Sequence, residues 1–374
     1  EIKQDFLEIE QKLFSITEEL ETDFLKFINP SNAVSERKRF FQEQAKRQEY
    51  NPRFVYLPKN PVFSHFSLNP EFARIMKQLN EIQLDEIGLG KLIGKKRIDL
   101  IKKMEFIRSI GSKTFTEKAI EFFGKPETKL VKKAEEVMEL EKGNELQNIR
   151  DWDCMEELHQ ALLNRNIYDW RIVVDENLAS NASVQTFQKI MKIRQGSFHS
   201  QQGIQRLIVH EIETHIYRYL NGAAQKYKIF TNGTDRNWQL TEEGLAVYNE
   251  QVFAVHNNDN LRDYAGRVLG IEYGLKHSFY ETFLFLKNFF EDDKAYQITQ
   301  RVKRGMHDTQ EKGAFTKDYF YLQGLETVKE FVEKGNNPKM LYYGKISVED
   351  IEHLKEIPEI IEPKFVPDYS KLKN

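Results

Sequence analysis

Residues 204–222 read Ile-Gln-Arg-Leu-Ile-Val-His-Glu-Ile-Glu-Thr-His-Ile-Tyr-Arg-Tyr-Leu-Asn-Gly, and the predicted fold is built around this stretch. Apolar side chains recur in it at steps of three and four, as in an amphipathic helix. Ser200 is placed to cap the start of the helix, and Asn221-Gly222 to end it. The stretch therefore predicts a helix over residues 204–222 that carries His210, Glu211 and His215.

The two histidines are five positions apart, one more than in the His-Glu-x-x-His pattern of zinc enzymes. On a regular α-helix this spacing is a rotation of about 500°, which leaves the side chains about 140° out of register. A π-bulge, with main-chain bonds from residue i to i+5, would bring His210 and His215 to one side. Such bulges favour functional sites. The alternative is a helix with two partly buried, hydrogen-bonded histidines.

A further metal ligand is available in residues 241–248, Thr-Glu-Glu-Gly-Leu-Ala-Val-Tyr. Thr241 is expected to cap a second helix, whose first turn holds Glu242 and Glu243. Gly244 has no side chain and lets another helix or a metal approach closely. Two histidines and a glutamate would leave one zinc position open to water, as in catalytic sites. Without the histidines, the two glutamates are explained as ordinary charges at a helix start.

Composition narrows the class of protein. The chain has 374 residues, of which 40% are hydrophobic and 12% aromatic, enough for a large buried core. A net charge of -3 gives no reason to expect a nucleic-acid or membrane partner, and no stretch approaches the roughly 20 apolar residues of a membrane span. The only cysteine, Cys154, rules out an internal disulfide, is expected to be a small buried side chain, and suits a cytoplasmic location.

The expected elements are mainly helices. Helical patterns cover residues 1–28, a stretch ending near 50, 69–82, 89–109, 114–123, 127–142, 242–256, 261–274 and 277–290. Residues 53–57 predict a short edge strand or an extended connection, and residues 170–174 and 187–194 predict strands. Ser347 and Asp350 predict a capped helix near 348–356. The predicted class is α+β, predominantly helical, with a small sheet before the helix of His210.

The predicted organisation has two regions. Residues 1–150 are expected to form a mostly helical N-terminal region. Residues 151–374 are expected to hold the metal-binding core and a C-terminal tail that wraps the surface. Both are expected to pack as one compact unit.

The segment His-Glu-Ile-Glu-Thr-His, followed by Thr-Glu-Glu-Gly-Leu-Ala, resembles the bacterial proteins named for a QEGLA motif and their eukaryotic relatives, the microtubule-associated tyrosine carboxypeptidases. Glu242 stands where the name motif has Gln. Three further segments also resemble this family: His215-x-x-Arg218-x-x-Asn221-Gly222, Arg304-Gly305, and Gly-Ala-Phe-Thr-Lys-Asp-x-x-Tyr-Leu-x-Gly at 313–324. The resemblance covers most of the chain from about residue 100 and implies a zinc metallopeptidase with a zincin-like core.

The dipeptidyl peptidase III family is similar in pairing His-Glu-x-x-x-His with a Glu-Glu-x-x-Ala segment, whose second glutamate binds zinc. By this analogy His210, His215 and Glu243 hold one Zn²⁺ per chain, which activates water and polarises the scissile carbonyl. Glu211 would take the proton from that water and deliver it to the leaving amine. Glu242, Arg218 and Asn221 are expected to support the ligands from behind.

A carboxypeptidase also needs a cation for the terminal carboxylate of its substrate, and an arginine in two-pronged geometry suits it best. The candidates are Arg304, Lys317 and Tyr321, with Arg218 and Arg301 behind them; the alternative for Arg218 is a pair with an acid such as Glu242.

In zinc peptidases an edge strand binds the extended substrate, and this resemblance makes Met191–Arg194 the candidate strand, with a plain core strand as the alternative.

The resemblance implies a carboxypeptidase that removes a C-terminal residue, aromatic and tyrosine-like, from a peptide or protein. Two other functions stay open. One is a non-catalytic binding or regulatory protein with a degenerate site. The other is a zinc aminopeptidase or dipeptidyl peptidase.

Overall fold

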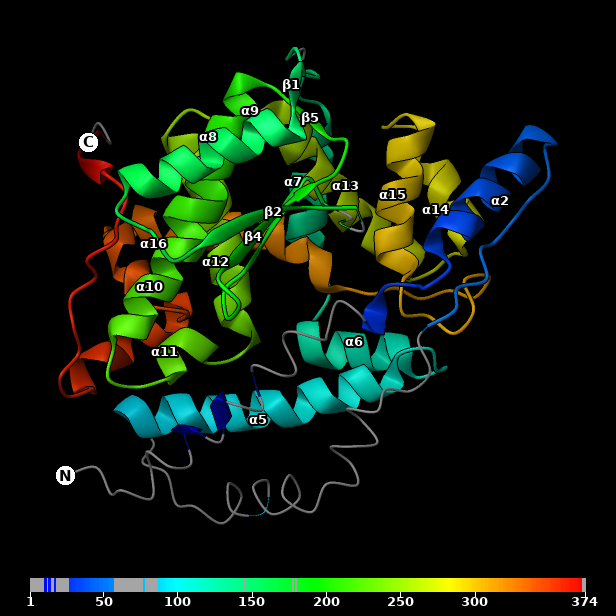
Figure 1. Cartoon of the computed structure of the whole chain (residues 1–374). Coiled ribbons are helices and arrows are strands. Elements are labelled where there is room, and N and C mark those ends of the chain that lie inside the picture. The colour runs from blue at the N-terminus through cyan, green and yellow to red at the C-terminus, as the bar shows by residue number, and fades with distance from the viewer. Residues whose placement is uncertain are drawn as a thin grey trace. The chain divides into compact units, whose positions relative to one another are not determined.

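The structure is a computed structural model that describes residues 27–56, 87–143, 145–176, 178 and 180–371, and the single positions 10, 11, 13, 14, 17 and 77. The described chain is mostly helical with two small sheets, which confirms the predicted α+β class (Figure 1). The expected helix at 69–82 and most of the one at 1–28 lie outside the described residues.

The chain packs as two compact units. Unit 1 comprises Glu1–Glu86, Ile93–Leu140 and Asn260–Gln323, and unit 2 comprises Ile87–Leu92, Glu141–Asp259 and Gly324–Asn374. Both units draw on segments from either side of residue 150. The division at that position stays a prediction.

Unit 1 is helical. Its elements are α2 (Ala33–Ala45), α6 (Phe115–Phe123), α7 (Thr128–Met138), α14 (Phe279–Leu286), α15 (Asp292–Lys303) and the 3₁₀ turn η2 (Lys317–Tyr319). An aromatic core joins α2, α14 and α15: the ring of Phe40 lies 5.4 Å from that of Phe279, 4.8 Å from Phe283 and 5.0 Å from Tyr296. Figure 1 shows these three helices beside one another.

Unit 2 combines helices with both sheets. Its elements are β1 (Ile149–Arg150), α8 (Asp151–Asn164), β2 (Arg171–Asp175), β3 (Ala182–Gln185), β4 (Ile190–Arg194), β5 (Phe198–His199), α9 (Gln201–Leu207), η1 (Ile208–Ile216), α10 (Tyr217–Ala224), α11 (Ile229–Asn232), α12 (Arg236–Val252), η3 (Pro338–Tyr342), η4 (Val348–Glu356) and η5 (Tyr369–Lys371). Three helices contain a division point between the units: α5 (Gly88–Ser109), α13 (Asn258–Gly274) and α16 (Phe320–Glu333).

The larger sheet has the order β2-β4-β3, with β4 parallel to β2 and antiparallel to β3. The strand expected at 170–174 is confirmed as β2, whereas β3 was not predicted. Met191–Arg194 belongs to the central strand, with Met191 and Ile193 fully buried. Both of its edges are already bonded, so its prediction as the substrate-binding edge is wrong. The edges of this sheet, within the described chain, are β2 and β3.

Several helix ends follow the sequence and others do not. Ser200 caps α9 as predicted, because its hydroxyl accepts from the Gly203 N–H at 2.9 Å. The helix continues past Asn221-Gly222 to Ala224. Thr241 is not a cap, because α12 begins at Arg236, where the carboxylate of Asp235 accepts from the main chain.

The remaining sequence predictions are local. Residues 51–56 form neither a helix nor a strand, so the edge strand is not seen in the described part of 53–57. The element at Val348–Glu356 is a 3₁₀ helix, and the carboxylate of Asp350 accepts from the Ser347 N–H at 2.9 Å. Cys154 is buried and free, as expected. Within the described residues, none of the helices has the length and apolarity to cross a membrane.

Candidate metal centre

The helix that carries the two histidines is interrupted by a π-helical segment. Residues Ile208–Ile216 form a π-helix between the α-helical turns of α9 and α10. The hydroxyl of Thr214 donates to the Val209 carbonyl, five residues earlier, at 3.0 Å. The extra residue is thereby absorbed, and the rings of His210 and His215 lie 5.0 Å apart, centroid to centroid. The bulge on which the metal hypothesis depends is therefore present, and the regular helix is excluded.

A buried hydrogen-bond network supports this π-helix. The side-chain amide of Asn249, on α12, donates to the hydroxyls of Thr214 at 2.9 Å and Tyr342 at 2.8 Å. The Tyr342 hydroxyl donates in turn to the Glu213 carbonyl at 3.0 Å. The Tyr369 hydroxyl donates to the side-chain oxygen Oδ1 of Asn249 at 2.7 Å. These bonds satisfy polar groups that the wider helix leaves without regular partners.

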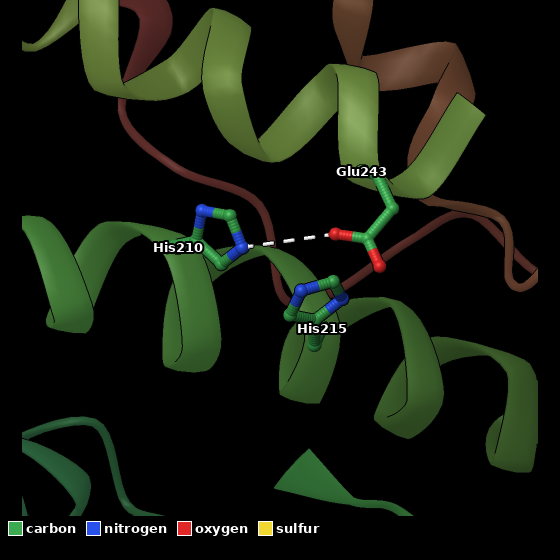
Figure 2. A group of neighbouring side chains, drawn as sticks. All are labelled: His210, His215 and Glu243. Atoms are coloured by element: carbon green, nitrogen blue, oxygen red, sulfur yellow. Dashed lines mark ion pairs between the residues drawn. The ribbon is translucent and has the colours of Figure 1, made fainter. Parts of the chain in front are cut away.

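Three potential metal ligands converge between the π-helix and α12. Figure 2 shows His210 and His215 on the π-helix, facing Glu243 on α12. Their ligand atoms all lie within 4.8 Å of one another, and His210 Nε2 is 3.9 Å from Glu243 Oε2. Ligand atoms of a tetrahedral zinc are separated by about 3.4 Å, as follows from bonds of roughly 2.0–2.1 Å. Small movements of the three side chains toward one another would bring their ligand atoms to that separation.

Each histidine is oriented by a buried carboxylate. His210 Nδ1 lies 2.6 Å from Glu250 Oε1, and His215 Nδ1 lies 2.7 Å from Glu242 Oε1. A carboxylate can only accept, so each bond favours the proton on Nδ1 and leaves the lone pair of Nε2 available. Metal-binding histidines in proteins are commonly held in this way.

Each of these carboxylates is in turn bonded to an arginine. Arg206 donates to Glu250 at 3.0 Å, and Arg218 donates to Glu242 at 2.9 Å, the pairing expected as the alternative for Arg218. Arg218 is fully buried and also donates to the carbonyls of Leu341 and Ile346. The two histidines thus have matching supports, each a chain of imidazole, carboxylate and guanidinium.

The charge of the site favours a cation. Burial would raise the pKa of Glu242, but Arg218 and the bond from His215 outweigh it and lower the pKa to about 2. Burial would lower the pKa of His215, but the bond to Glu242 and the nearby carboxylates of Glu211 and Glu243 raise it to about 9. The raised pKa of His215 reflects the three carboxylates around it, whose negative charge a divalent cation would also compensate, whereas the lowered pKa of Glu242 reflects the positive charges of Arg218 and His215.

Other residues predicted from the sequence lie elsewhere. Asn221 hydrogen-bonds to the main chain of Lys364 and Phe365, so its amide anchors the C-terminal tail rather than a metal ligand. Arg304, Lys317 and Tyr321 belong to unit 1, whereas the candidate metal ligands belong to unit 2.

Sequence reasoning missed Glu250 and Arg206, although both leave a periodic signal. Glu250 follows Glu243 by seven residues, two helical turns, and so shares its face of α12. Arg206 precedes His210 by four residues, the spacing of neighbours on one helix face. Asn249 left no such signal, because its partners Tyr342 and Tyr369 are distant in sequence.

The chain is similar to known proteins over most of its length. The sequence model of the family described as microtubule-associated tyrosine carboxypeptidase matches residues 38–374. The putative tyrosine carboxypeptidase MATCAP2 of Mus musculus is 30% identical over 176 residues, which is 45% of this chain and 33% of that protein. Microtubule-associated tyrosine carboxypeptidase 1 of Homo sapiens is 28% identical over 177 residues, which is 46% of this chain and 37% of that protein. The matched segments thus span about a third of the length of these curated relatives.

Proposed function

The chain belongs to the family of microtubule-associated tyrosine carboxypeptidases, and from this premise we propose that it is a zinc-dependent metallocarboxypeptidase with a zincin-like core. The proposed substrate is a peptide or protein whose C-terminal residue is tyrosine or a similar aromatic residue. The observation that carries the proposal is the convergence of His210, His215 and Glu243, with both imidazoles fixed through Nδ1.

The donor set suits zinc. Two imidazole nitrogens and one carboxylate oxygen are typical of catalytic zinc, whereas calcium and magnesium prefer sites made of oxygen atoms. Three protein ligands leave a fourth position for water or substrate. When bound there, zinc would lower the pKa of a water molecule toward 7 and polarise the scissile carbonyl.

Glu211 is the proposed general base. It follows His210 directly, is largely buried, and its charge reaches His215. Its carboxylate would accept the proton of the attacking water and then donate it to the leaving amine. Glu242 and Glu250 hold the imidazoles in place during the reaction and do not exchange protons with the substrate.

The proposed substrate is inferred from the family to which the chain belongs. A C-terminal carboxylate requires a cationic partner, and Arg304, Lys317 and Tyr321 remain the candidates proposed from the sequence. The names of the relatives associate them with microtubules, so a microtubule protein with a C-terminal tyrosine is the proposed partner. We place this activity in the cytoplasm.

Glu211→Gln tests this function. The substitution keeps the shape of the side chain but removes the base, so release of tyrosine from a tyrosine-ending peptide should fall by at least about a hundredfold while zinc content stays unchanged. Glu213→Gln is the matched control, because its side chain on the same π-helix bonds to Arg165 instead.

Two outcomes would overturn the proposal. If Glu211→Gln released tyrosine as fast as the wild type, the mechanism would be wrong. If an amidated C-terminus were cleaved as well as a free one, the enzyme would be an aminopeptidase or dipeptidyl peptidase instead.

A further inference from the structure

Arg267, on α13 in unit 1, packs against two tyrosines. Its guanidinium carbon lies 4.7 Å from the ring centre of Tyr321 and 5.2 Å from that of Tyr264. The two rings stack on each other with centres 4.8 Å apart and planes 6° apart. The side chain is half-buried. Across the residues that the structure describes, Arg267 makes these ring contacts but no hydrogen bond or ion pair to another side chain or to the main chain.

A second arginine of unit 1 also has a donor without a partner. Arg304 is 6% exposed, and its Nε has no hydrogen-bond partner within the described part of the chain. One of its terminal nitrogens donates to Asn29 at 3.1 Å, and another lies 3.5 Å from Asp318. One face of its guanidinium packs on Phe315. An unmatched N–H on a buried guanidinium is costly unless a ligand accepts from it.

Further charged side chains act on these two arginines. Asp318 is the acid of the cluster, and it pairs with Arg301 at 2.6 Å as well as with Arg304. Burial lowers the pKa of Arg304 to about 10, and the charges of Arg301 and Arg267 act in the same direction, against Asp318. The guanidinium groups of Arg267 and Arg304 thus lie near each other and near Arg301, and an anion bound between Arg267 and Arg304 would reduce their mutual repulsion.

We propose that Arg267 and Arg304 form a binding site for a peptide carboxylate in unit 1, with Tyr264 and Tyr321 as the platform that holds Arg267. A guanidinium binds a carboxylate through two parallel N–H bonds in one plane, and contact with aromatic rings holds the side chain without using its donors. In this assignment Tyr321 supports Arg267 instead of contacting the substrate. The peptide nature of the ligand rests on the proposed function.

The carboxylate could come from the C-terminus of the peptide or from an acidic side chain, and a binding experiment separates the two. The protein would carry Glu211→Gln so that the peptide is not cleaved. The probes are a fluorescent acidic peptide that ends in tyrosine, its C-terminal amide, and a version whose Asp and Glu are replaced by Asn and Gln. Each Kd is measured with and without Arg267→Gln and Arg267→Lys.

Arg267→Gln should weaken binding of the free-acid peptide by about 10-fold to 100-fold, the range expected for losing a charged, two-pronged contact. Arg267→Lys should lose most of the same affinity, because an ammonium lacks the planar fork. The matched control is Arg37→Gln, since Arg37 is an exposed arginine of unit 1 paired with Asp293, and it should leave the Kd unchanged. Circular dichroism checks that all variants fold.

The comparison of the three peptides then shows which carboxylate binds at this site. A loss confined to peptides with a free C-terminus assigns the site to the terminal carboxylate, and a loss confined to peptides with acidic side chains assigns it to those. If the Glu211→Gln protein had the same Kd for every peptide with and without Arg267→Gln, the proposal would be overturned. Binding that depends on Arg267, in a protein that binds no zinc and cleaves nothing, would support this site while refuting the proposed peptidase.

Discussion

At the scale of single residues, the most informative position is Glu242, where the sequence departs from the name motif. Because it is a glutamate, one oxygen accepts from His215 and the other from Arg218. A glutamine could accept with its oxygen but would carry no charge to balance Arg218. The carboxylate of its neighbour Glu243 faces Nε2 of His210 instead (Figure 2). Two adjacent glutamates thus have separate contacts, and we propose Glu242 as the support and Glu243 as the ligand.

Glu250→Gln tests whether the support of His210 matters for metal binding. The amide no longer carries the charge that orders the imidazole, and it leaves the cation of Arg206 without its ion pair. Zinc affinity should therefore fall by about 10-fold to 100-fold, as for other partners of metal-bound histidines. Competition with a chelator measures it.

Glu156→Gln, at an exposed position of α8, is the control and should bind zinc like the wild type. Unchanged affinity in Glu250→Gln would show that the carboxylate has no part in holding the metal ligand.

At the scale of elements, the π-helix decides whether the two histidines can act together. The five-residue spacing was sufficient to predict that a metal site requires a bulge, because a regular helix separates the side chains. The sequence did not reveal what stabilises the bulge, since Asn249 lies on another helix and Tyr342 and Tyr369 come from the C-terminal region. Helix ends and edge strands were also harder to predict: a competing cap at Asp235 and the short strand β3 depend on tertiary contacts.

Asn249→Ala tests this support of the π-helix. Asn249 is fully buried, and its removal leaves three hydroxyl groups, of Thr214, Tyr342 and Tyr369, without their amide partner. The free energy of unfolding should drop by about 2–4 kcal/mol, and zinc should bind more weakly because His215 is less well held. Chemical denaturation and a zinc titration measure the two effects.

Asn164→Ala serves as the comparison, because Asn164 is exposed at the end of α8. A stable Asn249→Ala protein with wild-type zinc affinity would mean that the network does not maintain the π-helix.

At the scale of the whole molecule, the metal ligands and the proposed carboxylate site fall in different compact units. Each unit combines segments from distant parts of the sequence, which composition and periodicity could not indicate. The proximity of His210, His215 and Glu243 was easier to predict than the architecture, because the three residues lie within 34 residues of one another, on two helices. Arg267 and Tyr264 carry no motif, and the role proposed for them follows only from their contacts with Tyr321.

We propose that the chain holds one catalytic zinc, and a measurement of its metal content decides whether it does. Elemental analysis would compare the wild type with His215→Ala, Glu243→Ala and the control His159→Ala, whose histidine is exposed on α8. We expect about one zinc per chain in the wild type and the control, and loss of zinc in both ligand variants. A wild-type protein without zinc, even after zinc is supplied, would contradict the account and favour a non-catalytic binding protein.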